Sequence, residues 1–393
     1  MKKKVLIFAL GLTMAAGMLT GCGGKKENAD TNTEKKAADD ADKTDQKNEP
    51  SGQSAYGDVK ADGKYKFHII VKSYSSDFWQ ATVKGAQDEA ELLGVEVQCD
   101  GPNTSSDIAD QVQMLNSAIS GKPDGIGIAA SDQDACLDSL QTALENEIPV
   151  VCFNSGIPDA PKGSVYATAT TDNYAAGEIA AEHMYDAIKD EIAEAKAPVR
   201  IGEVNQDSTS ESVIQRGLGF IDKMSELCAA DGKKLAVIGN DKFVADCKDS
   251  GDESTADVII EVRVPAQATN ELCATEASAL LNEEDLVGLM GTNQETTEGI
   301  LTANENLKKL GKDVSKGQVI GCGFDSGAII VAAVENDILY GAVTQAPRYQ
   351  GQVTIDLLTM VANGEEVTDV DTPAYWYDSA NISDPEIAPN LIK

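Results

Sequence analysis

The chain has 393 residues, of which 42% are hydrophobic, so it is long enough to bury one large core or two of ordinary size. Its formal net charge of −33 opposes binding to nucleic acid and to anionic headgroups, and the sequence contains no basic patch that would support such a role. We therefore expect a two-lobed protein that does not bind nucleic acid.

The first residues predict an export signal. Residues 1–22, MKKKVLIFALGLTMAAGMLTGC, hold a lysine triplet, a short glycine-interrupted apolar run and a terminal cysteine. This pattern is typical of a cleaved signal and is too short and broken for a membrane-spanning helix. LTGC resembles a bacterial lipobox, which implies a lipoprotein signal peptide over 1–21 and a lipid on Cys22. The alternative is an ordinary cleaved signal followed by a chance cysteine. With the lipid, the protein is expected on the extracytoplasmic face of the cell membrane of a Gram-positive-type cell.

The segment that follows predicts a tether. Residues 22–63 are rich in Lys, Asp, Asn and Gly and have almost no large apolar side chains, so burial cannot offset the entropy of ordering them. We predict a disordered tether that lets a globule reorient beside a membrane.

The other cysteines give little sign of metal or redox chemistry. Of the 8 cysteines, those other than Cys22 form no CxxC pair, and most lie in apolar strand or helix patterns. We interpret most of them as small buried hydrophobes. A disulfide between Cys228 and Cys247 is an open alternative.

From residue 66, short β-branched runs alternate with longer segments of helical periodicity. The pattern begins with KFHIIVKS and DFWQATVKGAQDEAELLG and restarts at APVRIGEVNQ. Repeated βα units predict an α/β fold with two similar doubly wound lobes, parallel sheets and a three-segment hinge. The expected lobes are 64–171 plus 346–375 and 172–345 plus 376–393, with a long acidic loop at 241–258.

Polar and aromatic side chains follow the predicted strands, at the sheet edge where open parallel sheets bind ligands. Asp325 leaves the buried run VIGCGF, and the glycines around FDS let a ligand approach the backbone. We expect it to face a cleft, so that its removal would leave stability almost unchanged. The strand-exit set is Lys72, Ser76, Phe78, Trp79, Asn154, Ser155, Asn293, Asp325 and Gln345.

These motifs resemble the ribose-binding and related sugar-binding proteins, the type I periplasmic binding fold that feeds ABC importers. SSDFWQATVKGAQDEAELLG, PVVCFNSG, QRGLGF, GTNQETTEGI, GFDSG and GAVTQAP occur in family order, and the resemblance covers nearly all of 66–382. It implies that the first lobe lines the ligand with Ser76, Phe78 and Trp79. It also implies hydrogen bonds to ligand hydroxyls from Asn154, Asn293, Asp325 and Gln345. Core packing is the alternative role for the two aromatic residues.

The chain also departs from the ribose pattern. Asn154 and Ser155 stand where the family has an Asp-Arg pair, and Ile214 stands at an arginine position, which leaves Arg216 as the nearest cation. Ribose itself is therefore not the expected ligand. Lys72, which ends an apolar strand, is similar to a lysine of autoinducer-2-binding relatives; a solvated residue at the cleft rim is the alternative.

We expect an extracytoplasmic solute-binding lipoprotein, monomeric and without cofactor or metal. It would capture a small sugar or sugar-like polyol between the lobes and deliver it to an ABC permease. The alternative is a receptor that presents its ligand for chemotaxis or quorum signalling, with an autoinducer-2-like ligand.

Two other classes fit less well. A sugar-responsive repressor would need a basic helix-turn-helix at the N-terminus, where this chain has an export signal. An enzyme would need an activated nucleophile or a phosphate loop, and neither His68 nor His183 accompanies such a motif. Asp325 and Glu295 could form an acid and base pair, but nothing in the sequence positions them for it.

Overall fold

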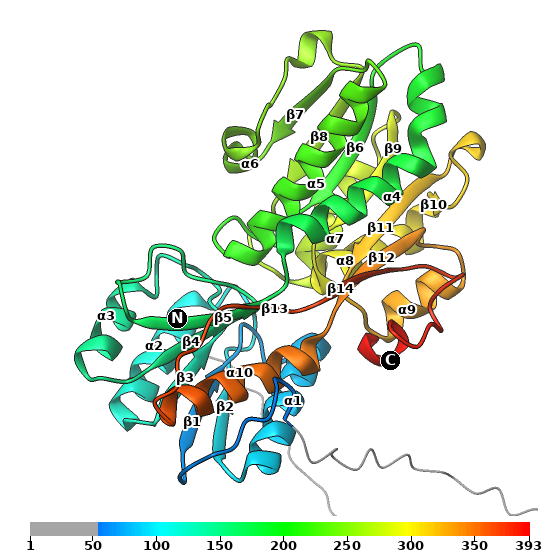
Figure 1. The fold of residues 1–393 in the computed structure, drawn as a ribbon. Coiled ribbons are helices and arrows are strands. Elements are labelled where there is room, and N and C mark those ends of the chain that lie inside the picture. Colours follow the sequence, from blue (N-terminus) through cyan, green and yellow to red (C-terminus); the bar gives the residue numbers. More distant parts are fainter. Residues whose placement is uncertain (1–53) are drawn as a thin grey trace, which may run out of the picture. The chain divides into compact units, whose positions relative to one another are not determined.

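The computed structural model describes residues 54–393, which form two α/β lobes (Figure 1). The predicted signal peptide, Cys22 and most of the predicted tether lie outside the described residues. The two sheets consist mainly of parallel strands covered by helices, so the predicted fold class is confirmed.

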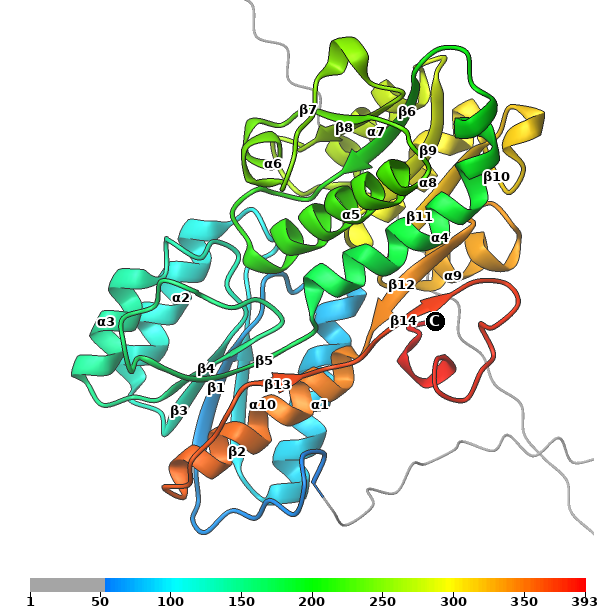
Figure 2. The ribbon, with the colours of Figure 1, turned by 45° about the horizontal axis from the view of Figure 1, so that its top comes forward.

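The N-terminal lobe is built on a sheet of order β13-β5-β4-β3-β1-β2. Its strands are β1 (Lys66–Ile70), β2 (Glu96–Asp100), β3 (Gly125–Ile128), β4 (Val150–Phe153), β5 (Val165–Thr170) and β13 (Val370–Asp371). Its helices are α1 (Asp77–Leu93), α2 (Ile108–Gly121), α3 (Leu137–Glu145) and α10 (Pro347–Ala362). One core packs α1 and α10 on one face of the sheet, and a second core packs α2 and α3 on the other (Figure 2).

The C-terminal lobe is built on a larger sheet of order β14-β12-β11-β9-β6-β8-β7, with β10 beside β11. Its strands are β6 (Val199–Val204), β7 (Leu235–Gly239), β8 (Val258–Arg263), β9 (Leu286–Gly291), β10 (Leu310–Gly311), β11 (Val319–Phe324), β12 (Gly341–Gln345) and β14 (Ala374–Tyr377). Its helices are α4 (Asn173–Glu194), α5 (Glu211–Ala230), α6 (Asp241–Asp246), α7 (Asn270–Leu281), α8 (Gln294–Leu307) and α9 (Ala328–Glu335). The predicted acidic loop holds α6 and a short 3₁₀ turn at Glu253–Thr255.

The chain passes between the two sheets at three places. It leaves β5 through Thr171 to reach α4, leaves β12 through Ala346 to reach α10, and leaves β13 through Thr372 and Pro373 to reach β14. The predicted boundary between residues 375 and 376 falls inside β14, which pairs antiparallel with β12. The third crossing is therefore earlier than predicted, because β13 ends at Asp371 and proline has no backbone N–H to continue its ladder.

Glycines allow α1 and α10 to touch along their backbones. A Cβ on Gly351 would lie 2.0 Å from the carbonyl oxygen of Thr82, and a Cβ on Gly85 would lie 2.0 Å from the carbonyl oxygen of Arg348. No other residue fits at these two positions without moving the helices apart. The contact holds the first turns of α10, next to the second crossing, firmly against the N-terminal lobe.

Residues 54–63, predicted as part of the tether, are instead bound to the N-terminal lobe. The backbone N–H of Ala55 donates to Glu89 at 3.2 Å, and that of Tyr56 donates to Asp356 at 2.8 Å. Tyr56 and Ala61 pack against the core formed by α1 and α10. The sequence prediction missed this because the segment itself is polar. Its backbone N–H groups are bound by the carboxylates of Glu89 and Asp356, which lie far away along the chain.

Glu89 and Asp356 form a buried pair of carboxyl groups between α1 and α10. Burial raises the pKa of both, and that of Asp356 reaches about 8, with the nearby Glu89 as the next cause. Asp356 Oδ1 has no hydrogen-bond partner among the described residues. Because the folded-state pKa lies above the ordinary 3.8, the stability associated with this group is full below about pH 4 and is lost as the pH rises to about 8.

We expect Asp356→Asn to stabilise the protein at alkaline pH, because the amide still accepts from Tyr56 and carries no charge. The gain should be about 1–2 kcal/mol at about pH 9 and much smaller at about pH 5. Urea unfolding at the two pH values measures it, with Glu91→Gln, an exposed residue of the same helix as Glu89, as control. An equal change at both pH values would show that Asp356 is already ionised in the folded protein.

Among residues 54–393, no helix is both long and apolar enough to cross a membrane. The cysteines in this range are all free thiols and most are buried, so the structure does not contain a Cys228–Cys247 disulfide.

Candidate functional site

The carboxyl ends of strands from both sheets surround one small cavity between the lobes. Its lining combines amides, carboxylates, hydroxyls, two cations and two aromatic rings. The lining residues are Lys72, Ser76, Phe78, Trp79, Asn154, Gln206, Ser212, Val213, Arg216, Asn293, Gln294, Glu295, Asp325 and Gln345. The cavity volume is about 20 Å³, which is space for about one water molecule.

The structure brings together nearly all of the residues selected from the sequence. Every one of them lines this cavity except Ser155, which follows Asn154 in the sequence. The Ser155 hydroxyl accepts a hydrogen bond from the backbone N–H of Ser212 at 3.2 Å, so it joins the two lobes beside the cavity. The structure thus places the predicted set around a single space, and ligand binding by these residues remains a proposal.

Asp325 and Asn154 both have the left-handed backbone conformation, with φ of 65° and 59°. Aspartate and asparagine tolerate this conformation better than most residues, and such strain clusters at functional sites. Each stands immediately after a buried strand and turns the chain sharply, so that its side chain faces the space between the lobes. The residue type at these two strand exits therefore fits both the turn and a polar contact.

The Asp325 carboxylate is deeply buried, and each of its oxygens accepts one hydrogen bond. Its Oδ1 accepts from Gln345 Nε2 at 2.6 Å, and its Oδ2 accepts from the backbone N–H of Gln294 at 3.2 Å. Arg216 Nη1 lies 3.9 Å from Oδ2. Burial raises the pKa of Asp325, and the charge of Arg216 is the main opposing influence.

Arg216 is held rigidly from several sides. Its Nε donates to Asn173 Oδ1 at 2.9 Å and its Nη1 to the carbonyl oxygen of Thr292 at 3.1 Å, while the guanidinium lies 4.0 Å above the Phe324 ring. The guanidinium is only 3% exposed, and burial lowers its pKa while Asp325 opposes that shift. Arg216 therefore supports Asp325 as well as lining the cavity.

Lys72 crosses from the N-terminal lobe to the first turn of α5. Its ammonium group donates to the hydroxyls of Ser210 and Ser212, the latter at 3.0 Å. The side chain is 3% exposed, so the rim position considered from the sequence is wrong. Burial lowers the pKa of Lys72 to about 8, and the charge of Asp207 is the largest opposing influence. Lys72 thus remains mainly a cationic donor at neutral pH.

Sequence reasoning did not select Gln206, Ser212, Val213, Gln294 or Glu295. Gln206 follows β6 and obeys the same strand-exit rule as Asn154, so that rule could have found it. Gln294 is more surprising, because its Oε1 accepts from the Ser76 hydroxyl at 3.0 Å and from the backbone N–H of Phe78 at 3.2 Å in the other lobe.

Glu295 also lines the cavity, although the sequence suggested it only as a possible acid–base partner of Asp325. It lies in the first turn of α8, where a carboxylate is favoured by the helix dipole, and burial raises its pKa to about 7. The second carboxyl group of the cavity is therefore partly protonated at neutral pH, unlike a surface glutamate.

Phe78 and Trp79 line the cavity and also belong to the N-terminal core. Their ring centroids are 5.0 Å apart in an edge-to-face arrangement, and the Phe153 centroid lies 6.3 Å from that of Trp79. Both rings therefore pack in the core and also form an aromatic wall of the cavity, while their contact with a ligand remains a proposal.

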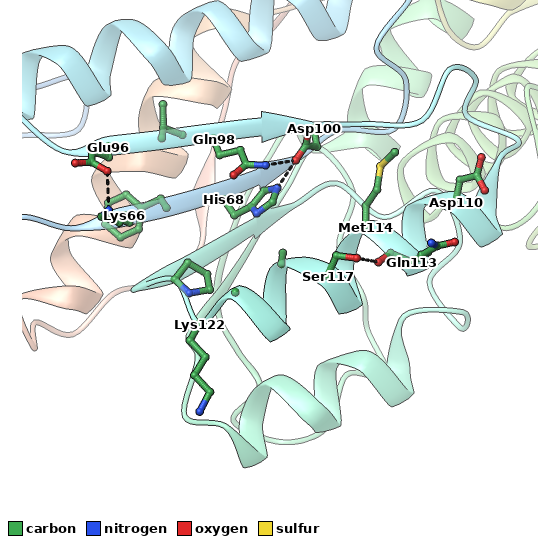
Figure 3. Close-up of a pocket in the computed structure, with 15 residues that line it drawn as sticks. Lys66, His68, Glu96, Gln98, Asp100, Asp110, Gln113, Met114, Ser117 and Lys122 are labelled. Atoms are coloured by element: carbon green, nitrogen blue, oxygen red, sulfur yellow. Dashed lines mark hydrogen bonds and ion pairs between the residues drawn. The ribbon is translucent and has the colours of Figure 1, made fainter.

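A larger cavity of about 680 Å³ lies on the N-terminal lobe, beside α2 and the edge of the sheet (Figure 3). His68 Nε2 lies 2.7 Å from Asp100 Oδ2, and Lys66 pairs with Glu96 at 3.1 Å. These side chains stand on β1 and on the edge strand β2, and they belong to one lobe only. The cavity is thus separate from the space between the lobes.

Within residues 54–393, no group of three or more His, Cys, Asp or Glu side chains is arranged to hold a metal ion. The side chains that line the interlobe cavity can offer hydrogen bonds, ion pairs and aromatic contacts.

We expect Asp325→Asn to destabilise the protein, which corrects the expectation drawn from the sequence. Asparagine keeps the backbone turn but leaves Arg216 without its nearest carboxylate. The loss should be about 3 kcal/mol, at the lower end for a broken buried pair because Glu211 and Glu295 also lie near the guanidinium.

Urea unfolding of Asp325→Asn, Arg216→Met and the double variant tests this. The double variant should recover part of the loss, since neither charge is then left alone. Unchanged stability of Asp325→Asn would mean that the ion pair contributes nothing to folding.

The chain is similar to known proteins over most of its length. The family described as periplasmic binding protein domain matches residues 67–366. A solved structure of a protein described as an ABC transporter, LacI family transcriptional regulator, from Brachyspira murdochii is 32% identical, with a TM-score of 0.69, over 84% of this chain and 99% of that one. A solute-binding protein of an ABC transporter from Agrobacterium vitis, with bound D-fucose, is 26% identical with a TM-score of 0.67, over 84% of this chain and 100% of that one.

A curated relative is similar over a shorter stretch. The D-allose-binding periplasmic protein of Escherichia coli (strain K12) is 28% identical over 156 residues, which is 37% of this chain and 50% of that protein. The matched stretch thus spans half the length of that relative. Together with the two parallel sheets, the crossings and the interlobe cavity, the family match over residues 67–366 shows that the chain belongs to the periplasmic binding protein domain family.

Proposed function

We propose that this protein is the sugar-binding component of an ABC importer and captures a monosaccharide or similar polyol between its lobes. The observation that carries the proposal is the convergence of planar amides and carboxylates with an aromatic wall on one interlobe cavity. Asn154 belongs to the N-terminal lobe, whereas Asn293, Asp325 and Gln345 belong to the C-terminal lobe. A ligand that contacts all four must bridge the lobes.

The chemistry of this lining suits a sugar. A sugar has hydroxyl edges that both donate and accept hydrogen bonds and C–H faces that are apolar. Amide side chains can donate hydrogen bonds to sugar hydroxyls or accept hydrogen bonds from them. Asp325 can accept from hydroxyls, and Lys72 can donate to them. Phe78 and Trp79 supply an apolar surface for a C–H face.

Binding requires the lobes to separate and close again. A cavity of about 20 Å³ cannot admit a sugar ring, so the lobes must part about their crossings for entry. Closure would replace the direct contacts from Lys72 to Ser212 and from Gln294 to Ser76 by contacts through the ligand. A permease that binds the closed form more tightly than the open form would then recognise the protein when it carries its ligand.

The relatives support a sugar as ligand and import as the role. One similar solved structure holds D-fucose, and the curated relative is named for D-allose. Both are hexoses, and the departures at Asn154 and Ile214 already argue against ribose. These relatives carry transport or sugar-binding names, which favours import over presentation of a ligand to a receptor. We infer a binding role without catalysis.

We also propose that a lipid on Cys22 holds the protein on the outer face of the cell membrane. This rests on the LTGC motif and the export signal before it, which lie outside the described residues. The chain between Cys22 and Ser54 would then connect the lipid to the bound segment on the N-terminal lobe.

We expect a monosaccharide or a similar polyol to raise the melting temperature of residues 54–393. A thermal-shift panel of D-allose, D-fucose, other aldohexoses, pentoses including ribose, polyols and amino sugars identifies the ligand, and calorimetry gives its affinity. A ligand that binds only the folded state adds about 2.7 kcal/mol of stability at about a hundred times its dissociation constant. Absence of any shift across the panel would contradict the proposal.

The panel has a matched pair of variants. Lys72→Met removes a charged donor from the cavity and should weaken binding by about tenfold to a hundredfold, the usual range for a hydrogen bond to a charged group. Lys66→Met removes an exposed lysine from the same lobe, far from the cavity, and should bind as the wild type does.

We expect Cys22→Ser to move the full chain from the membrane fraction to the soluble or secreted fraction while leaving sugar affinity unchanged. Cys99→Ser, at a half-buried cysteine of the N-terminal lobe, is the control and should remain in the membrane fraction. Membrane retention of Cys22→Ser at the wild-type level would exclude the lipid anchor at this residue.

A further inference from the structure

Gln350 lies at the junction of the three crossings, on the first turns of α10, and does not line the interlobe cavity. Its side chain is fully buried. Its Nε2 lies 3.2 Å from Thr171 Oγ1, 3.0 Å from Thr372 Oγ1 and 3.4 Å from Gln345 Oε1. One side chain therefore contacts all three segments that join the lobes.

The same residue also contacts the amides that line the cavity. Gln350 Oε1 accepts from Asn154 Nδ2 at 3.4 Å, and Gln345, another of its partners, donates to Asp325 at 2.6 Å. Thr171 and Thr372 are joined to each other at 3.1 Å. A continuous set of buried hydrogen bonds thus runs from the hinge through Gln350 to residues on both sides of the cavity.

The Gln350 amide has fewer N–H donors than there are oxygen acceptors around its nitrogen. A primary amide has two N–H bonds, whereas three oxygens lie within hydrogen-bond distance of Gln350 Nε2. Gln350 cannot hold all three with good geometry at once. A rotation of the lobes can therefore exchange its partners without leaving the amide unsatisfied, which a residue with one fixed partner could not do.

Gln350 stays with the N-terminal lobe when the crossings move. Its neighbour Gly351 allows the close backbone contact of α10 with Thr82 of α1, so this turn of the helix has no freedom to slide. Gln345 belongs to the C-terminal sheet, and Thr171 and Thr372 belong to the crossings. Gln350 is thus a fixed point against which the other parts of the hinge can rotate.

We propose that Gln350 is the positioning residue of the hinge, which sets how far the lobes close and orients Asn154 and Gln345 toward the ligand. The part of this inference that concerns the ligand rests on the proposed function. Gln350 touches no ligand in this account and acts through its neighbours. Its loss should therefore change the distance between the lobes as well as the affinity.

The test compares Gln350→Met with Gln352→Met. Methionine has a similar length and no amide, so the first variant removes every hinge contact of this side chain. Gln352 lies on the same helix, and within residues 54–393 its amide donates to Glu89 alone, at 3.2 Å in the same lobe. Labels on noncanonical amino acids at the exposed Glu145 and Glu305, one in each lobe, report the interlobe distance by pulsed electron resonance.

Without added sugar, Gln350→Met should show a broader and longer interlobe distance than the wild type, and Gln352→Met should not. With the sugar identified in the panel, Gln350→Met should close incompletely and bind about tenfold more weakly. A distance distribution and an affinity equal to those of the wild type would overturn the inference.

Thr372→Val provides a second route if Gln350→Met does not fold. It removes one partner of the amide, together with the contact between Thr372 and Thr171, and should also lengthen the distance. An unchanged distance in Thr372→Val alone would count against the inference. If the wild type binds no sugar, the proposed function fails, whereas the distances measured without sugar still decide the role of Gln350.

Discussion

The hydrogen bond from Gln345 to Asp325, 2.6 Å long, connects the hinge of this protein to its interlobe cavity. Gln345 ends the strand that leads into the second crossing, and Asp325 ends the neighbouring strand β11 at the interlobe cavity. Because strands of a parallel sheet end at the same edge, the hinge and the cavity are built from adjacent residues. A change of hinge geometry must therefore move the groups that line the cavity.

The polar interior of the C-terminal lobe makes this arrangement possible. A buried ionisable group is stable only when its charge is paired with another group or when the group is in its neutral form. Arg216 meets the first condition through Asp325, Asn173 and the Thr292 carbonyl. Glu203 meets the second, because burial raises its pKa to about 8, so it is mostly neutral at neutral pH. Asn205 connects Glu203 to this network by donating to it at 3.1 Å.

The two lobes fold around separate apolar cores, and the contacts between them are mainly polar. Each cluster of buried apolar residues lies within one lobe, whereas Ser76, Lys72 and Ser155 make hydrogen bonds across the boundary. Apolar burial across a hinge would oppose opening in proportion to its area, but polar contacts can be exchanged for water or ligand. This difference suits a protein that must open and close without losing either core.

Local patterns in the sequence were sufficient for the order of strands and helices, the two lobes and most of the cavity lining. A βα unit is encoded by periodicity over a few residues, and the rule that strand exits gather at one sheet edge then places Asn154, Asn293 and Asp325 together. The same rule applied to β6 would have added Gln206. These inferences need no knowledge of how one lobe faces the other.

What the tertiary structure decided depends on contacts between residues distant along the chain. The sequence did not show that residues 54–63 bind Glu89 and Asp356, that Gln294 reaches Ser76 and Phe78, or that Gln350 meets all three crossings. Glutamine and serine side chains also occur on solvated surfaces, so the residue type alone does not show whether such a side chain is buried or which partner it contacts. Only the packing of α10 on α1 and the approach of the two sheet edges bring the partners within hydrogen-bond distance, because a hydrogen bond tolerates deviations of only a few tenths of an ångström.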